Sequence, residues 1–330
     1  MRRIDSDDRL TRAARALIAV AAAAALAATA GCGADATDSP AASSAATGTS
    51  GAATSTGAAT SAGAAHTVAA AEAGVSWAPA AQATLHPGVQ AYTGDSQCTT
   101  NFVFTDAKGE VYLGQAAHCG YTGTDKLPNG CTAQTVPLGT AVDLRTGGSV
   151  RAEGTTKATG SLAYSSWRTM QEAGEKGADL CANNDFALIR LPKSAAGSVN
   201  PSLPTWGGPV GLGVDRVHAG ERVFGYGDSS LRGGVNALSP HRGTLQSPEP
   251  DAGGWAHTVI AARPGVPGDS GAAYVDSEGY ALGTLSTLSL GVPPRNSLSD
   301  LSRELRYAQE HSGIAGLRLV LGTEPFHAGG

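Results

Sequence analysis

Large apolar side chains are scarce in the first 85 or so residues of this 330-residue chain. Residues 33–85 also contain no lysine or arginine, and their Ala, Ser, Thr and Gly residues show no helical or strand period. Such a segment cannot bury enough apolar surface to form a core. We therefore expect a disordered linker over residues 32–86 and a folded part over residues 87–330.

Charge of either sign is also scarce. Charged residues make up 15% of the chain, and the formal net charge is −5. Because no basic stripe is present to neutralise phosphates, this composition argues against nucleic-acid binding. The high glycine content, 45 residues, favours a secreted, loop-rich β protein over a helical one.

A hydrophobic run long enough to span a membrane is missing from the amino terminus. The apolar stretch 16–30 is alanine-rich, follows five arginines and ends in small residues. It is too short and too weakly hydrophobic for a transmembrane helix, whereas a secretory signal peptide has this pattern. We therefore expect a signal peptide over residues 1–31.

Two processing sites compete at the end of this signal. Residues 28–30, Ala-Thr-Ala, fit ordinary cleavage, and residues 30–32, Ala-Gly-Cys, resemble the end of a bacterial lipobox that would leave Cys32 lipidated. The cysteine count of five favours lipidation, because Cys32 stands alone before the linker and the other four lie in the folded part. We expect a protein anchored at the cell envelope through Cys32, with secretion as the alternative.

The folded part shows many short apolar runs separated by Gly, Asn and Pro. Strands are predicted at 89–92, 101–104, 111–113, 140–143, 162–164, 186–191, 222–226, 255–260, 272–275 and 281–285. So many short strands indicate an all-β sandwich or barrel. One long helix is predicted after a cap at Ser299 or Asp300, and an extra strand is predicted over residues 316–321.

Three motifs carry chemistry. Residues 267–271 read Pro-Gly-Asp-Ser-Gly, a tight turn in which backbone N–H groups converge beside the Ser270 hydroxyl. His118 lies directly before Cys119 at the end of an apolar strand, and Asp185 opens another. Each motif alone is common in loops, but a serine nucleophile needs a histidine base and an orienting acid, and both are present.

From about Val89 onward, the order His, Asp, Ser and these motifs resemble the chymotrypsin-like (trypsin-like) serine proteases of the bacterial secreted or lipoprotein type. The resemblance implies two six-stranded antiparallel β-barrels, over about 87–200 and 201–330, with a C-terminal helix and the site in the cleft between them. It implies that Ser270 is the nucleophile, His118 the base and Asp185 the orienting acid. The backbone N–H groups of Gly268 and Ser270 would form the oxyanion hole.

The resemblance also assigns structural residues. Asp269 would be buried and need a cation, and because no activation site precedes Val89, we expect Arg222 to serve. Ser286 would lie beside one wall of the substrate pocket, with Pro264 at its floor, so that a neutral substrate side chain is expected. The family pattern pairs Cys98 with Cys119, which leaves Cys131 to pair with Cys181.

The expected function is an extracytoplasmic serine endopeptidase acting on protein or peptide substrates as a monomer. The remaining histidines show no metal-ligand spacing, so we expect no metal and no other cofactor. Membrane contact is expected only through Cys32. Two alternatives remain open: a catalytically silent binding module with the same fold, and an esterase or acyltransferase that uses the same triad.

Overall fold

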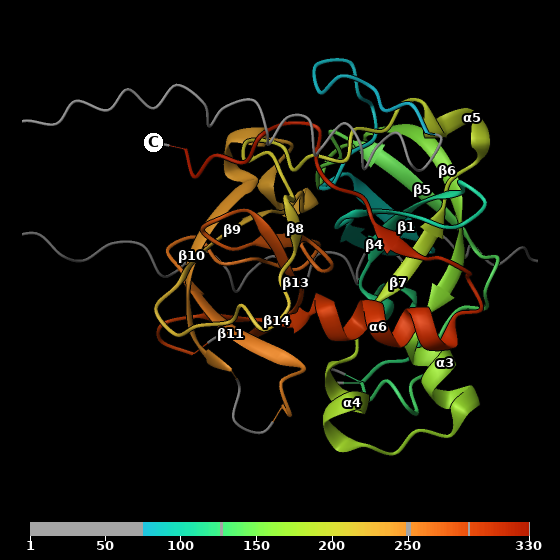
Figure 1. Cartoon of the computed structure of the whole chain (residues 1–330), viewed down its shortest axis with the longest axis vertical. Coiled ribbons are helices and arrows are strands. Elements are labelled where there is room, and N and C mark those ends of the chain that lie inside the picture. The colour runs from blue at the N-terminus through green and yellow to red at the C-terminus, as the bar shows by residue number, and fades with distance from the viewer. Residues whose placement is uncertain (1–74, 126–127, 249–251, 290, 330) are drawn as a thin grey trace, which may run out of the picture. The chain divides into compact units, whose positions relative to one another are not determined.

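The computed structural model describes residues 75–125, 128–248, 252–289 and 291–329 (Figure 1). The strands of the first sheet are β1 (Gln90–Thr93), β2 (Ser96–Thr99), β3 (Val103–Thr105), β4 (Val111–Gln115), β5 (Ala141–Thr146), β6 (Thr155–Ser165), β7 (Ala187–Arg190) and β15 (Arg318–Leu319). The strands of the second are β8 (Gly211–Leu212), β9 (Arg222–Tyr226), β10 (Pro240–Pro248), β11 (Ala256–Ala261), β12 (Ala273–Val275), β13 (Tyr280–Ser289) and β14 (Arg295–Asp300). The helices are α3 (Ser166–Ala173), α4 (Ala178–Asn183), α5 (Lys193–Ala196) and α6 (Leu301–His311), with 3-10 turns η1 (Ala117–Gly120), η2 (Ser230–Arg232) and η3 (Asn236–Leu238).

The first sheet curls back on itself. Its order is β15-β3-β4-β7-β6-β5-β1-β2, and all its pairings are antiparallel. Only residues 100–102 separate β2, at one end of this order, from β3 near the other. If β2 and β3 are taken as one bent strand, they complete a six-stranded barrel with β4, β7, β6, β5 and β1. Alternating burial along β5, with Val142 and Leu144 inside, is the period-2 pattern of a strand with one face on the core.

The second sheet is a closed barrel. Strands β12, β9, β10, β11, β14 and β13 pair in this order, and β12 also pairs with β13. The short β8 adds a parallel pairing outside the ring. The expected architecture, two six-stranded antiparallel barrels followed by a C-terminal helix, is therefore the one observed.

Helix α6 joins the cores of the two barrels. Its residues Leu301, Leu305 and Ala308 are buried in one apolar cluster with Phe186 of the first barrel and Phe224 of the second. Asp300 caps the helix, because its side chain accepts a hydrogen bond from the N–H of Arg303. In Figure 1 the helix runs from the end of β14 toward the first barrel.

Most predicted strands are present, and the predicted extra strand forms as β15 on β3. Four strands were missed: β2, β10, β14 and the two-residue β8. The sequences of the first three, SQCT, PHRGTLQSP and RNSLSD, are rich in polar residues, so no apolar period marks them. The short helices α3, α4 and α5 were also missed.

The folded part begins earlier than the expected boundary at Pro87. Leu85 is fully buried, and its backbone N–H donates to the carbonyl of Ser198. Trp77 packs against the first core, and the side chain of Asn200 donates to the carbonyl of Ala78. The alanine-rich composition concealed this, because the few large residues are spread over a segment held by backbone hydrogen bonds.

The predicted signal peptide, Cys32 and most of the predicted linker lie outside the described residues. Among the helices that are described, none is long and apolar enough to cross a membrane.

Candidate active site

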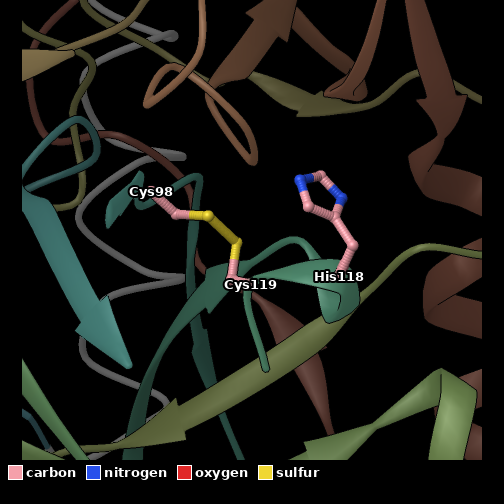
Figure 2. Close-up of side chains that lie close together, drawn as sticks. All are labelled: Cys98, His118 and Cys119. Atoms are coloured by element: carbon pink, nitrogen blue, oxygen red, sulfur yellow. A yellow bond between two sulfur atoms is a disulfide. The ribbon is translucent and has the colours of Figure 1, made fainter. Parts of the chain in front are cut away.

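His118 lies directly after the hairpin formed by β3 and β4. It lies in η1, the turn that follows β4. The next residue, Cys119, forms a disulfide with Cys98 of β2, and Figure 2 shows this bond beside His118. The disulfide therefore fixes the backbone that carries the imidazole. It also leaves no free thiolate, so the close grouping of Cys98, His118 and Cys119 is not a metal-binding set in this oxidised form.

Asp185 orients the His118 ring. Its Oδ2 lies 2.6 Å from Nδ1 of His118, and its Oδ1 accepts the backbone N–H of His118 at 2.8 Å. The Ser286 hydroxyl donates to the same Oδ2 at 2.7 Å. Asp185 is 2% exposed, and no Lys or Arg of the described chain pairs with it. The carboxylate charge is thus directed at the imidazole.

The environment of His118 favours the protonated ring. Burial by itself lowers the pKa of the imidazole, but the charge of Asp185 and its hydrogen bond outweigh this and raise the pKa above the ordinary value of 6.5. With Nδ1 bonded to Asp185, Nε2 remains to exchange a proton with a nucleophile or leaving group.

Ser270 lies in the loop between β11 and β12. Gly268 and Gly271 flank it at φ of +95° and +87°, a backbone region that side chains disfavour. A Cβ at Gly271 would lie 2.7 Å from the backbone nitrogen of Ala116, two residues before His118, so the serine loop closely abuts the histidine segment. Neither the N–H of Gly268 nor that of Ser270 makes a hydrogen bond within the described chain. Two donors beside the hydroxyl are therefore free to bind an oxyanion.

The Ser270 hydroxyl and the His118 ring make no hydrogen bond to each other in the part of the chain described. In enzymes of this chemistry that bond commonly tightens only when substrate binds. The two residues face the same stretch of β13, because Ser286, Thr287 and Leu288 border both the cavity at His118 and the cavity at Ser270.

These residues occupy two antiparallel barrels, with His118 and Asp185 on the first and Ser270 on the second. This two-barrel arrangement is the one expected from the sequence. No protein-family model matches the chain, and no curated protein matches it. Among solved structures, Thermobifida fusca Protease A is similar at a TM-score of 0.46 and 18% identity, covering 72% of this chain and 99% of its own. Nocardiopsis protease (NAPase) is similar at a TM-score of 0.42 and 16% identity, covering 71% of this chain and 98% of its own. Cellulomonas bogoriensis chymotrypsin is similar at a TM-score of 0.42 and 16% identity, covering 72% of this chain and 98% of its own.

Arg232, not Arg222, neutralises Asp269. The Asp269 carboxylate is fully buried and pairs with Arg232 of η2, and it also accepts the N–H groups of Ser229 and Val266 at 2.9 Å. Arg222 is exposed on β9 and stacks at 5.9 Å over the ring of Phe224. The expectation failed because the Arg222 side chain points outward from its strand. Arg232, in the 3-10 turn η2, instead reaches the buried carboxylate of Asp269.

A histidine completes this buried cluster. Arg232 Nη2 lies 2.8 Å from His241 Nε2, and His241 Nδ1 lies 2.8 Å from the hydroxyl of Tyr274. Burial lowers the pKa of His241 to about 4, so the ring is neutral at pH 7 and its Nε2 accepts from the guanidinium. The serine loop is therefore held by the Asp269–Arg232 ion pair, and the neutral imidazole of His241 holds Arg232 in turn through a hydrogen bond.

The cavity beside Ser270 has a volume of ≈ 180 Å³. Its lining residues are all uncharged, and they include Leu285, the predicted wall residue Ser286 and the buried amide Asn296. Pro264, expected at the floor, is not among them, and its carbonyl lies 3.3 Å from Arg232 Nη2.

The second disulfide joins Cys131 to Cys181, the pair that the family resemblance leaves once Cys98 is bonded to Cys119. Cys181 belongs to α4, which ends at Asn183, two residues before Asp185. The bond therefore ties the Asp185 segment to the loop that follows His118.

Sequence analysis missed three residues near His118 and Asp185. Trp167 of α3 lies 6.4 Å from the His118 ring between centroids, and Tyr121 packs edge-on against Trp167. The third, Glu304, carried a readable signal: it lies three residues after Leu301 and four before Ala308, on the apolar face of the predicted helix. A carboxyl group on that face had to be buried.

Proposed function

We propose that this chain is a serine endopeptidase that hydrolyses peptide bonds through Ser270, His118 and Asp185. The single observation that carries the proposal is the Asp185–His118 pair at 2.6 Å, set beside a serine loop with two unbonded backbone N–H groups. Ser270 attacks the scissile carbonyl while His118 Nε2 takes its proton and later delivers it to the leaving amine. Asp185 holds the tautomer and stabilises the imidazolium.

The oxyanion that forms on the substrate carbonyl is stabilised by the N–H groups of Gly268 and Ser270, a contribution of about 10²–10³ in rate per donor in comparable sites. The substrate side chain before the scissile bond enters the uncharged cavity beside Ser270. The substrate class is therefore polypeptides cleaved after a neutral residue.

Digestion of a diverse peptide library tests this function. We expect internal cleavage after uncharged residues by the wild type and none by Ser270→Ala. Hydrolysis of acyl esters without any peptide cleavage would instead identify an esterase or acyltransferase. Inertness toward both substrate classes would identify a silent binding module.

The proposed location is extracytoplasmic, with Cys32 carrying a lipid anchor. Two disulfides favour an oxidising compartment. A single acyl chain binds membranes only marginally, but a diacylglyceryl group on Cys32 would hold the enzyme at the envelope. We expect Cys32→Ala to move the protein from the membrane fraction to the medium with unchanged specific activity. Recovery of the wild type in the medium, with Gly31 as its first residue, would contradict the anchor.

A further inference from the structure

A second carboxylic acid lies directly behind the proposed triad. Glu304 of α6 is fully buried, and in the part of the chain that the structure describes no Lys, Arg or His pairs with it. Its Oε1 accepts the backbone N–H of Asp185 at 3.0 Å. Its Oε2 lies 3.2 Å from the hydroxyl of Thr284, a fully buried residue of β13. Glu304 thus links the C-terminal helix to the backbone of the residue that orients His118.

The charged and titratable groups around Glu304 favour its neutral form. Asp185 lies before β7 and Asp300 caps α6, and both carboxylates act on Glu304 with the same sign. Tyr164 of β6 also interacts with it electrostatically. From the segment after α3, Glu175 reaches Tyr307 instead, at 3.4 Å. His257 of β11 is bonded to Asp300 at 2.8 Å.

Two neighbouring buried carboxyl groups without a cation do not both ionise. Asp185 accepts three donors, including the imidazole, whereas Glu304 accepts only from neutral groups. Asp185 therefore keeps the charge and Glu304 keeps a proton. In agreement, burial and then the charge of Asp185 raise the pKa of Glu304 well above its ordinary range.

We propose that Glu304 is a positioning residue, an uncharged buried acid that fixes the backbone of Asp185 from α6 without adding a second negative charge behind His118. The inference rests on the proposed function, because it gives Glu304 a role in that reaction. Two properties follow. The hydrogen-bond acceptor at this position is needed for the rate, and the ionisable proton is not.

Kinetics of two substitutions separate these properties. Glu304→Gln keeps an acceptor of the same shape, so its kcat/KM stays within about threefold of wild type. Glu304→Leu leaves the buried N–H of Asp185 unpaired, and misplacement of a catalytic group by about 1 Å costs up to about 10² in rate. We expect kcat to fall about 10–100-fold, with KM nearly unchanged. Glu310→Gln, at an exposed site of the same helix, is the matched control and changes neither constant.

If Glu304→Leu does not fold, Glu304→Asp tests the same point, because its shorter side chain draws the acceptor away from Asp185 and also lowers kcat. Wild-type kcat in a folded Leu or Asp variant would overturn the positioning role.

NMR titration of the His118 ring in a Ser270→Ala background tests the charge state independently of hydrolysis. If Glu304 is neutral, adding Glu304→Gln changes the His118 pKa by less than about 0.3 units. If Glu304 is ionised, removing its charge lowers that pKa by on the order of one unit, which would overturn the proposal. A wild type that cleaves no peptide would refute the proposed function, and this titration would still report the charge of Glu304.

Discussion

Each barrel buries one aspartate at the site, and the two aspartates have different kinds of partner. Asp269 in the second barrel pairs with Arg232, a permanent cation. Asp185 in the first meets only neutral donors and the titratable His118. A permanent cation neutralises the charge of its partner, so the ion pair of Asp269 with Arg232 serves to hold the serine loop in place. The charge of Asp185 remains available to the His118 imidazole, which becomes positive in the proposed reaction.

The comparison shows why burial alone does not identify a catalytic acid. Both aspartates are at most 2% exposed, and both accept backbone N–H groups. What differs is whether the partner titrates near neutral pH. Substitutions on the two sides should therefore separate activity from stability.

Asp185→Asn should have the largest effect. An amide at this position favours the wrong imidazole tautomer and supplies no charge, and such a change costs about 10⁴ in kcat. The melting temperature should change little, because the side-chain shape is kept. The control Asp143→Asn, on β5 and 35% exposed, should leave kcat unchanged. Steady-state kinetics and thermal melts check both variants, and a fall of less than tenfold would remove Asp185 from the triad.

Arg232→Met should act on stability. It leaves Asp269 buried without a cation, which typically costs about 3–5 kcal/mol. Arg222→Met, on an exposed side chain of the same barrel, should change the unfolding free energy by about 0.5 kcal/mol or less. Urea unfolding of both variants measures the difference. Equal stabilities would show that Arg232 is not the partner of Asp269 in solution.

These contrasts mark what the sequence could predict. His118, Asp185 and Ser270 each sit in a short local motif, so they could be proposed from the sequence, and the two cysteine pairs that the family pattern implies are observed. The cation for Asp269 was not, because Arg232 is 37 residues away in a loop with no periodic pattern. Strands β10 and β14 were missed for a related reason, since polar strands of a closed barrel are held by neighbours far along the chain.

Ser286→Ala should have a smaller effect than Asp185→Asn or Arg232→Met. The hydroxyl supplies one of three donors to the Asp185 carboxylate, and a hydrogen bond to a charged group contributes about 1.5–3 kcal/mol. We expect kcat to fall at least about tenfold, with the backbone N–H and the imidazole still holding Asp185. Unchanged kcat would show that the hydroxyl is not needed to orient the carboxylate.

A change of pH should alter the rate less than any of these substitutions. In the proposed mechanism the neutral ring of His118 is the base, and because its pKa is raised above 6.5, kcat/KM should increase with pH through an ionisation above that value and then level off. Asp228 also titrates nearby, since burial and Asp269 raise its pKa to about 6. Asp228→Asn should leave the limb in place. Disappearance of the limb in this variant would assign it to Asp228.

Labelling with a fluorophosphonate probe tests the central claim most directly, because the probe reacts only with an activated serine. Wild type should be labelled at neutral pH on the peptide that contains Ser270, at a rate that rises with ionisation of His118. His118→Ala and Asp185→Asn should label far more slowly, and Ser270→Ala not at all. Absence of labelling in the wild type at pH 7–8, or equal labelling of Ser270→Ala, would contradict the account.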